Sequence, residues 1–70
     1  MTLEKLLEVM EYGKRVMITI GETGATSAWM HNERSKMILN YKENKDRNVL
    51  SFTPSTNGIE IVLEGDKDEN

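Results

Sequence analysis

Apolar residues near the start of the chain recur at the spacing of a helix. They fall at positions i, i+3, i+4 and i+7, which places them on one stripe of a helix surface. These residues are Leu3, Leu6, Leu7 and Met10. Thr2 can serve as the N-cap, because its hydroxyl can accept a hydrogen bond from a free backbone N–H of the first turn. Gly13 stands where a left-handed residue ends many helices, so the pattern predicts a helix over residues 3–12.

The next two segments predict strands. Val16, Ile18 and Ile20 alternate with the other residues of the segment 15–20, which is rich in β-branched side chains. A run with two glycines follows and predicts a turn. Residues 25–30 then predict a second strand, antiparallel to the first.

Residues 31–47 fit two patterns. Side chains recur every four residues up to Tyr41, as in a helix, and apolar residues also alternate from Met37 to Tyr41, as in a strand. Periodicity does not separate a helix from a strand over so short a run. We favour a helix over 33–40, and the alternative is a strand over 36–42.

The last third of the chain predicts a hairpin. A polar connection at 42–48 leads to a strand over 49–53, which Pro54 interrupts. Residues 55–58 end in Asn-Gly, a strong hairpin signal. Residues 59–64 again alternate apolar and polar side chains and predict the final strand.

The order of these elements predicts the fold class. Helix, strand, strand, a short second helix, strand, strand is the order of an α+β domain. We expect a small antiparallel or mixed sheet of four strands with the N-terminal helix packed on it. The sheet has five strands if 36–42 is a strand. Residues 1–65 then form a single domain, and 66–70 form an acidic, disordered tail.

The chain is short, with 70 residues, and contains no cysteine. No disulfide framework, thiolate nucleophile or zinc ribbon is therefore available. Domains below about 70–80 residues usually depend on disulfides, a metal or association, so we expect a protein partner or a homo-oligomer. The same small size argues against a deep substrate pocket of about 300 Å³.

The length of the apolar segments and the charges near the start of the chain predict where in the cell the protein is located. The longest apolar runs have three residues, far below the roughly 18 of a membrane span. The first residues include Glu4, Glu8 and Glu11, whereas a signal peptide has a basic start and an apolar stretch without acidic residues. We therefore expect a cytoplasmic protein with no membrane contact.

His31, the one histidine, carries the candidates for metal and nucleophilic chemistry. With Glu33 it falls short of the four ligands of a structural zinc site. A nucleophilic triad with Ser27 or Ser35 has no Gly-x-Ser-x-Gly elbow to support it. Residues 21–27 resemble a phosphate loop but lack its lysine. We interpret His31 as a surface residue at a turn, and we predict no enzyme activity and no catalytic, cofactor-binding or metal-binding residue.

Charge is distributed unevenly along the chain. Residues 33–47 carry five basic and three acidic side chains, whereas 60–70 carry five acidic and one basic. The basic side chains form a candidate patch for nucleic acid. They are Arg34, Lys36, Lys42, Lys45 and Arg47. The net charge of −3 argues against nucleic-acid binding, because affinity for phosphates comes from a net basic surface.

The last strand predicts a surface for a protein partner. Glu60, Val62 and Glu64 share one of its faces, since successive side chains of a strand point to opposite sides. A single helix leaves one face of a small sheet uncovered, so these residues are candidate partner contacts. Trp29 is either an anchor of such an interface or, as we favour, part of the core.

Two parts of the chain together resemble a known group of proteins. Residues 2–10 lead into 16–20, and residues 46–52 lead into 58–63. In this order the chain resembles small, uncharacterised accessory proteins of phages and conjugative transposons of Gram-positive bacteria. The resemblance implies a mobile-element origin and a cytoplasmic location, and it assigns no functional residue.

These observations predict a non-enzymatic accessory module of a mobile genetic element that binds another protein and needs no cofactor. One alternative is an inhibitor of a nucleic-acid-handling host defence system, of the anti-restriction or anti-CRISPR type. In that case the carboxylates of residues 60–69 mimic phosphates. A weak nucleic-acid binder that uses the basic side chains is a further alternative.

Overall fold

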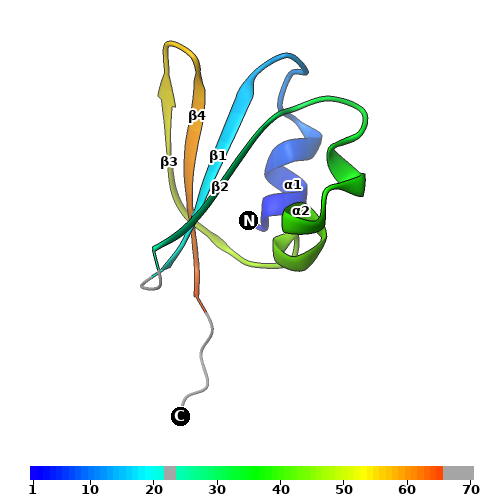
Figure 1. The fold of residues 1–70 in the computed structure, drawn as a ribbon. Coiled ribbons are helices and arrows are strands. Elements are labelled where there is room, and N and C mark those ends of the chain that lie inside the picture. The colour runs from blue at the N-terminus through cyan, green and yellow to red at the C-terminus, as the bar shows by residue number, and fades with distance from the viewer. Residues whose placement is uncertain (22–23, 66–70) are drawn as a thin grey trace.

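The computed structural model describes residues 1–21 and 24–65 (Figure 1). Its elements are α1 (Leu3–Glu8), β1 (Arg15–Ile20), β2 (Ala25–Met30), the short 3₁₀ helix η2 (Ser35–Met37), α2 (Leu39–Asn44), β3 (Val49–Ser55) and β4 (Gly58–Leu63). The strands form one four-stranded sheet in the order β2-β1-β4-β3. This is the α+β arrangement that the sequence predicted. The predicted acidic tail, 66–70, lies outside the described residues, as do residues 22 and 23 of the predicted turn.

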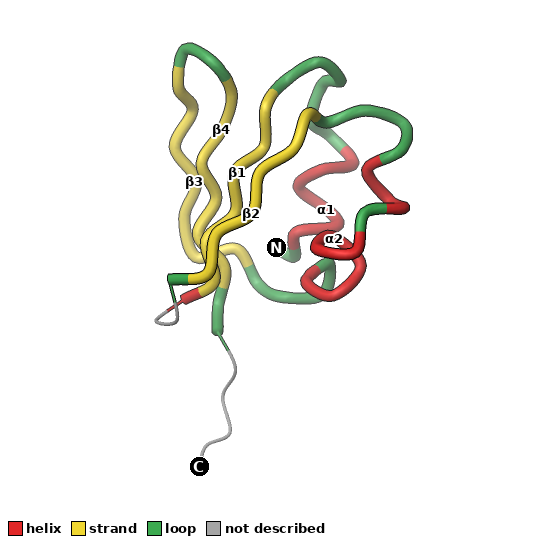
Figure 2. The backbone as a smooth tube through the Cα atoms, in the orientation of Figure 1, coloured by secondary structure: helices red, strands yellow, loops and turns green. Residues whose placement is uncertain are grey.

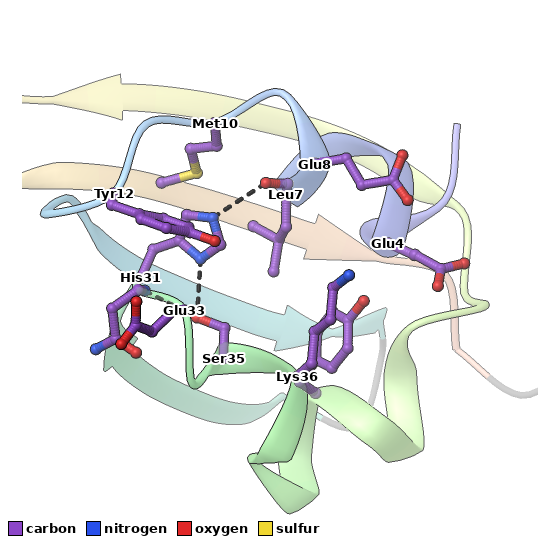
Figure 3. Close-up of a pocket in the computed structure, with 11 residues that line it drawn as sticks. Glu4, Leu7, Glu8, Met10, Tyr12, His31, Glu33, Ser35 and Lys36 are labelled. Atoms are coloured by element: carbon purple, nitrogen blue, oxygen red, sulfur yellow. Dashed lines mark hydrogen bonds between the residues drawn. The ribbon is translucent and has the colours of Figure 1, made fainter.

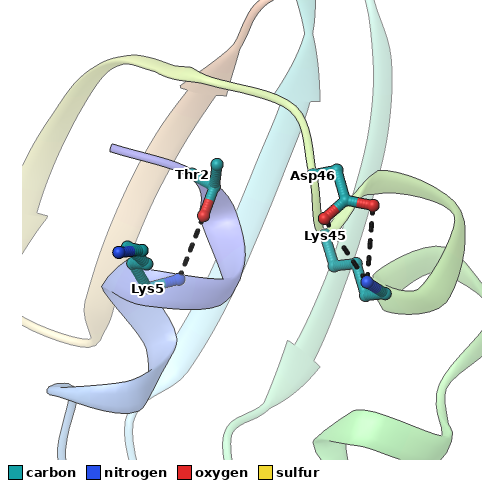
Figure 4. Close-up of polar contacts among 4 residues, drawn as sticks. All are labelled: Thr2, Lys5, Lys45 and Asp46. Atoms are coloured by element: carbon teal, nitrogen blue, oxygen red, sulfur yellow. Dashed lines mark hydrogen bonds and ion pairs between the residues drawn. The ribbon is translucent and has the colours of Figure 1, made fainter.

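Helix α1 begins as predicted but ends earlier. The Thr2 hydroxyl accepts a hydrogen bond from the backbone N–H of Lys5, with 3.3 Å between oxygen and nitrogen (Figure 4). The helix ends at Glu8 instead of residue 12, and Val9 caps it. Its buried side chains are Leu3, Leu6 and Leu7. Beyond them, Val9 is 78% exposed, and Met10 packs partly against the core from outside the helix.

Gly13 provides the turn from α1 into β1. Its φ of +90° lies in the region that glycine adopts without steric cost. Its backbone N–H donates to the carbonyl of His31 over 2.8 Å. The expected left-handed conformation is therefore confirmed, but Gly13 does not cap the helix, because α1 has already ended at Glu8.

The sheet is mixed, with β1 and β4 at its centre. β1 pairs antiparallel with β2 and parallel with β4, while β3 and β4 form the predicted antiparallel hairpin. Arg15 lies opposite Gly58 at the start of the parallel pair. A Cβ atom on Gly58 would lie 2.1 Å from the carbonyl oxygen of Arg15. This position therefore requires glycine because the two backbones come so close.

Strand β3 continues through Pro54, contrary to the prediction that proline interrupts it. β3 lies at the edge of the sheet, where a proline that faces away from the neighbouring strand is tolerated. Its pairing with β4 shifts register between Val49 and Ser51. The edge formed by β3 is thus irregular at one end and lacks a backbone donor near the other.

The segment 31–47 is helical but interrupted. Ile38 separates η2 from α2, and its backbone is extended, with a ψ of 129°. The prediction of a helix is correct in type but wrong in its bounds, and the alternative strand at 36–42 does not form. α2 extends to Asn44, into the predicted polar connection, and buries Tyr41 against the core.

Both α-helices lie on the same face of the sheet (Figures 1 and 2). The core between them and the strands consists of Leu3, Leu6, Leu7, Val16, Ile18, Tyr41, Ile61 and Leu63. Alternate strand residues point to the opposite face. No helix or strand within 1–21 and 24–65 covers that side, which we call the open face. From β1, β2 and β4 it presents Arg15, Met17, Thr19, Thr26, Ala28, Met30, Glu60 and Val62.

Candidate functional site

A pocket of about 340 Å³ lies between α1, the segment after β2, and α2 (Figure 3). The side chains that matter for its chemistry are Glu4, Glu8, His31, Glu33, Ser35, Lys36 and Tyr41. The size of the chain argued against a pocket of this volume. The pocket forms between elements rather than inside the small core, which is why chain length did not predict it.

His31 forms an inner wall of the pocket. It is 4% exposed, so its interpretation as a surface residue is wrong. Its Nε2 lies 3.0 Å from the carbonyl oxygen of Leu7, and its Nδ1 lies 2.8 Å from the Oγ of Ser35. The rings of His31 and Tyr12 meet edge to face, with 5.1 Å between their centroids. These contacts hold the segment after β2 against the end of α1.

The hydroxyl of Ser35 determines the tautomer of His31. It accepts hydrogen bonds from the indole N–H of Trp29, at 3.2 Å, and from the backbone N–H of Asn32, at 3.0 Å. A hydroxyl has two acceptor lone pairs and one donor, so its proton must go to Nδ1 of His31. Nε2 therefore carries the ring proton and donates it to the carbonyl of Leu7.

The fold thus brings together the histidine and one of the serines of the triad considered above. Their separation of 2.8 Å is that of a nucleophile and its base. A nucleophilic serine, however, keeps a lone pair free to attack the substrate. Both lone pairs of Ser35 accept hydrogen bonds, and the residue is only 2% exposed. The His31–Ser35 pair is therefore suited to holding the wall in place rather than to nucleophilic attack.

Tyr41 forms a second inner wall. It is 4% exposed, and its hydroxyl makes no hydrogen bond within the described residues. Burial raises the pKa of its phenol, and the carboxylate of Glu4 raises it further. Lys45 lowers the pKa, and Glu8 adds a smaller rise. The phenol therefore lies in the field of the acidic side chains that line the pocket, with its hydrogen-bonding capacity unused.

The pocket carries a net negative charge. Three carboxylates line it, those of Glu4, Glu8 and Glu33, against the single ammonium of Lys36. Glu4 and Glu8 are four residues apart and so project from the same side of α1. Figure 3 shows them at one end of the pocket. Their spacing is visible in the sequence, but their proximity to Tyr41 of α2 is a product of the fold.

The four predicted partner-binding residues do not form one site. Glu60 and Val62 lie together on the open face. Glu64 follows the end of β4, and its Oε1 accepts a hydrogen bond from the side-chain amide of Asn48 at 3.1 Å. Trp29 lies on the face covered by the helices, partly buried against the core. The open face therefore keeps two of the four residues.

The predicted basic patch is also divided. Arg34, Lys36 and Lys42 are exposed, and none of them forms an ion pair with another described residue. The Nζ of Lys45 lies 3.3 Å from a carboxylate oxygen of Asp46 (Figure 4). Arg47 donates through Nε to the side-chain oxygen of Asn44, at 2.7 Å, and through Nη1 to the carbonyl of Glu64, at 3.1 Å. Arg47 thus links the end of α2 to the end of β4.

Three further findings concern the chain more broadly. Within 1–21 and 24–65, no helix has the length and apolar character needed to cross a membrane. The same residues contain no group of three His, Cys, Asp or Glu side chains placed to hold a metal ion. Comparisons with protein-family models, curated protein sequences and solved structures found no match to this chain.

Proposed function

We propose that this domain is a non-catalytic protein-binding module that receives a basic side chain of its partner in the pocket beside α1. The observation that carries the proposal is the buried hydroxyl of Tyr41, which makes no hydrogen bond to any described residue and shares the pocket with the carboxylates of Glu4 and Glu8. Arginine and lysine side chains carry hydrogen-bond donors and no acceptors. The pocket offers the acceptors that such donors need. An accessory role in a mobile genetic element belongs to the same proposal.

An arginine side chain fits the pocket best. Its guanidinium presents several N–H groups in one plane and often bonds carboxylates in pairs. Tyr12, which is 64% exposed, adds an aromatic ring that can contact the cation. The hydrogen bonds of His31 fix the inner wall, and a preformed pocket loses less entropy on binding. The volume of about 340 Å³ suits one side chain rather than a large substrate.

A short peptide pair tests this proposal. The ¹⁵N-labelled protein is titrated with acetyl-Gly-Arg-Gly-amide and, separately, with the same peptide carrying citrulline, which has the shape of arginine without its charge. We expect amide shifts at Glu8 and His31 with the arginine peptide and much smaller shifts with the citrulline peptide. Equal shifts with both peptides, shifts confined to other surfaces, or no shifts at all would each contradict the proposal.

Matched variants locate the binding site. Glu4→Gln combined with Glu8→Gln removes two carboxylates from the pocket, and we expect about tenfold weaker binding, or roughly 1.4 kcal/mol. Glu11→Gln removes a carboxylate from the same part of the chain but outside the pocket lining. It should leave the affinity unchanged. An equal loss in both variants would indicate a general effect of charge and not a specific site.

A further inference from the structure

The outer edge of β2 is a second distinct feature of the surface, separate from the pocket. β2 is an end strand of the sheet, and no strand of the described chain pairs with its outer side. Such an edge presents unpaired N–H and C=O groups that can template another strand. Natural proteins block open edges with charged residues, prolines or bulges. The residues of β2 therefore decide whether its edge is available.

β2 has none of these blocking features. Its residues are Ala25, Thr26, Ser27, Ala28, Trp29 and Met30. None is charged and none is proline. All six pair with β1 in one continuous register. The strand is thus regular along its whole length.

The opposite edge of the sheet, formed by β3, is different. Pro54 has no backbone N–H to donate. The register between β3 and β4 shifts between Val49 and Ser51. A strand approaching β3 would meet a missing donor and an irregular backbone, so β2 is the better edge for pairing.

The hydrogen bonds of His31 show which groups of β2 face outward. Its N–H donates to the carbonyl of Lys14, and its carbonyl accepts from the N–H of Gly13, both over 2.8 Å. The backbone of His31 therefore faces the side of β1. Successive residues of a paired strand alternate between facing their neighbour and facing away. The residues that face away are Thr26, Ala28 and Met30.

We propose that two copies of this chain pair through β2, antiparallel, about a two-fold axis at Ala28. In this register Ala28 pairs with the partner's Ala28, and Thr26 pairs with the partner's Met30, so every outward residue is used. The carbonyl of Met30 already accepts a bond from Asn32 at 3.1 Å, and its second lone pair remains for the partner. The two sheets join into one, with the helices of both copies on the same side.

The sequence of β2 favours a second copy as the occupant. A two-fold axis brings the same surface together from both sides, so a charge at the axis position, residue 28, would meet its own like charge. β2 has no charge, and its central outward residue is the small, exposed Ala28. The paired strands therefore approach without repulsion or steric conflict. The proposal does not depend on the pocket, and its failure would leave the proposed function untouched.

Sedimentation equilibrium tests the proposal on the unmodified chain. Across a range of about 1 μM to 1 mM, which brackets weak to moderate association, we expect the mass to rise from 8.0 kDa toward twice that value. A mass that stays at 8.0 kDa throughout this range overturns the proposal.

Two lysine variants then distinguish the edges. Ala28→Lys places two ammonium groups beside the axis, and we expect loss of the dimer. Thr53→Lys makes the same kind of change on the exposed surface of β3, opposite Glu60, and we expect the dimer to persist. A dimer that survives Ala28→Lys, or one that is lost in Thr53→Lys, contradicts pairing through β2.

Hydrogen exchange on the unmodified protein gives a readout that does not depend on either variant folding. The amides of Thr26 and Ala28 should be protected at 1 mM and should lose that protection on dilution to about 1 μM. Fast exchange at both concentrations would show that these amides remain unpaired and would overturn the proposal.

Discussion

A single hydroxyl, that of Ser35, joins three parts of the molecule. It bonds Trp29 from β2, Asn32 from the following loop and, through His31, the carbonyl of Leu7 in α1. A buried polar group left without its partner costs about 1–3 kcal/mol. Ser35 therefore has more influence on stability than its small side chain suggests.

Removing this hydroxyl should destabilise the fold. In Ser35→Ala the indole of Trp29, the amide of Asn32 and Nδ1 of His31 all lose a partner, and we expect a loss of about 2 kcal/mol. For a domain of this size that lowers the melting temperature by about 10 °C. Ser27→Ala on β2 is the control and should change it little. If Ser35→Ala has the same melting temperature as the unmodified chain, the result would contradict the hydrogen-bond network.

The phenol of Tyr41 reports the electrostatic field inside the pocket. Tyr12→Phe leaves it as the only tyrosine, because the chain has two. Since burial and then Glu4 raise its pKa, we expect ultraviolet absorbance to show ionisation above the usual pH of about 10. Adding Glu4→Gln should move the midpoint down, whereas Glu11→Gln should not. A midpoint insensitive to Glu4→Gln would place Tyr41 outside the field of α1.

The raised pKa of Tyr41 also makes the stability of the fold depend on pH in the alkaline range. The pKa of Tyr41 is higher in the folded protein than in the unfolded chain, so the unfolded chain ionises first as the pH rises. The contribution of Tyr41 to stability is therefore complete below about pH 10 and is lost as the pH rises through the folded pKa.

At the scale of elements, local patterns predicted the type of each element more reliably than its ends. Alternation located β1 to the residue, because Val16 and Ile18 of one face are buried in the core. The bounds of β2 were also predicted correctly, from the turn that precedes it and not from alternation. Helix α1 ends at Glu8 and β3 passes through Pro54, and neither boundary follows from local pattern. Both boundaries depend on tertiary structure. The end of α1 depends on how the residues after Glu8 pack against the core, and the passage of β3 through Pro54 depends on its position at the sheet edge. The interruption of the second helix at Ile38 has the same origin in tertiary packing.

The parallel pairing of β1 with β4 should depend on Gly58. In Gly58→Ala the new methyl group would lie 2.1 Å from the carbonyl oxygen of Arg15, so the two strands must separate. Overpacking of this kind costs about 3 kcal/mol, which chemical denaturation can measure. Gly13→Ala is a useful comparison, because nothing lies within 4 Å of its new methyl group, and only the backbone strain of about 1 kcal/mol applies. Equal losses in the two variants would contradict the close approach of β1 and β4.

At the scale of the whole molecule, the two faces of the sheet should respond differently to charge. Val62 lies on the open face, so Val62→Lys should fold and keep its stability to within about 0.5–1 kcal/mol. Ile61, its neighbour on β4, is 1% exposed in the core, and Ile61→Lys should prevent folding. Circular dichroism and thermal melting distinguish the two outcomes. If Val62→Lys also unfolds, the open face is part of a core.

The candidate site was harder to predict than the fold. Glu4 and Glu8 follow helical spacing, but Tyr41 enters the pocket from α2, and His31 bonds a carbonyl 24 residues away. No short-range pattern contains these relations. The sequence placed His31 on the surface at a turn, and this prediction is wrong because the side chain is 4% exposed. The open face, by contrast, could be predicted. Apolar and polar side chains alternate along β4, and the few predicted helices leave one face of the sheet uncovered.

The place of β4 in the sheet has a consequence for how the protein is made. β4 is the last strand in the part of the chain that the structure describes, yet it lies between β1 and β3. It supplies Ile61 and Leu63, which are 1% and 0% exposed. The nascent chain therefore lacks an inner strand of its sheet until residue 63 has been synthesised. Until then Val16 and Ile18 can pair with β2 but not with Ile59 and Ile61 of β4. Because such long-range pairing is slow and leaves apolar surface exposed in the meantime, we expect the domain to fold in one late step after β4 leaves the ribosome, rather than progressively from its first helix.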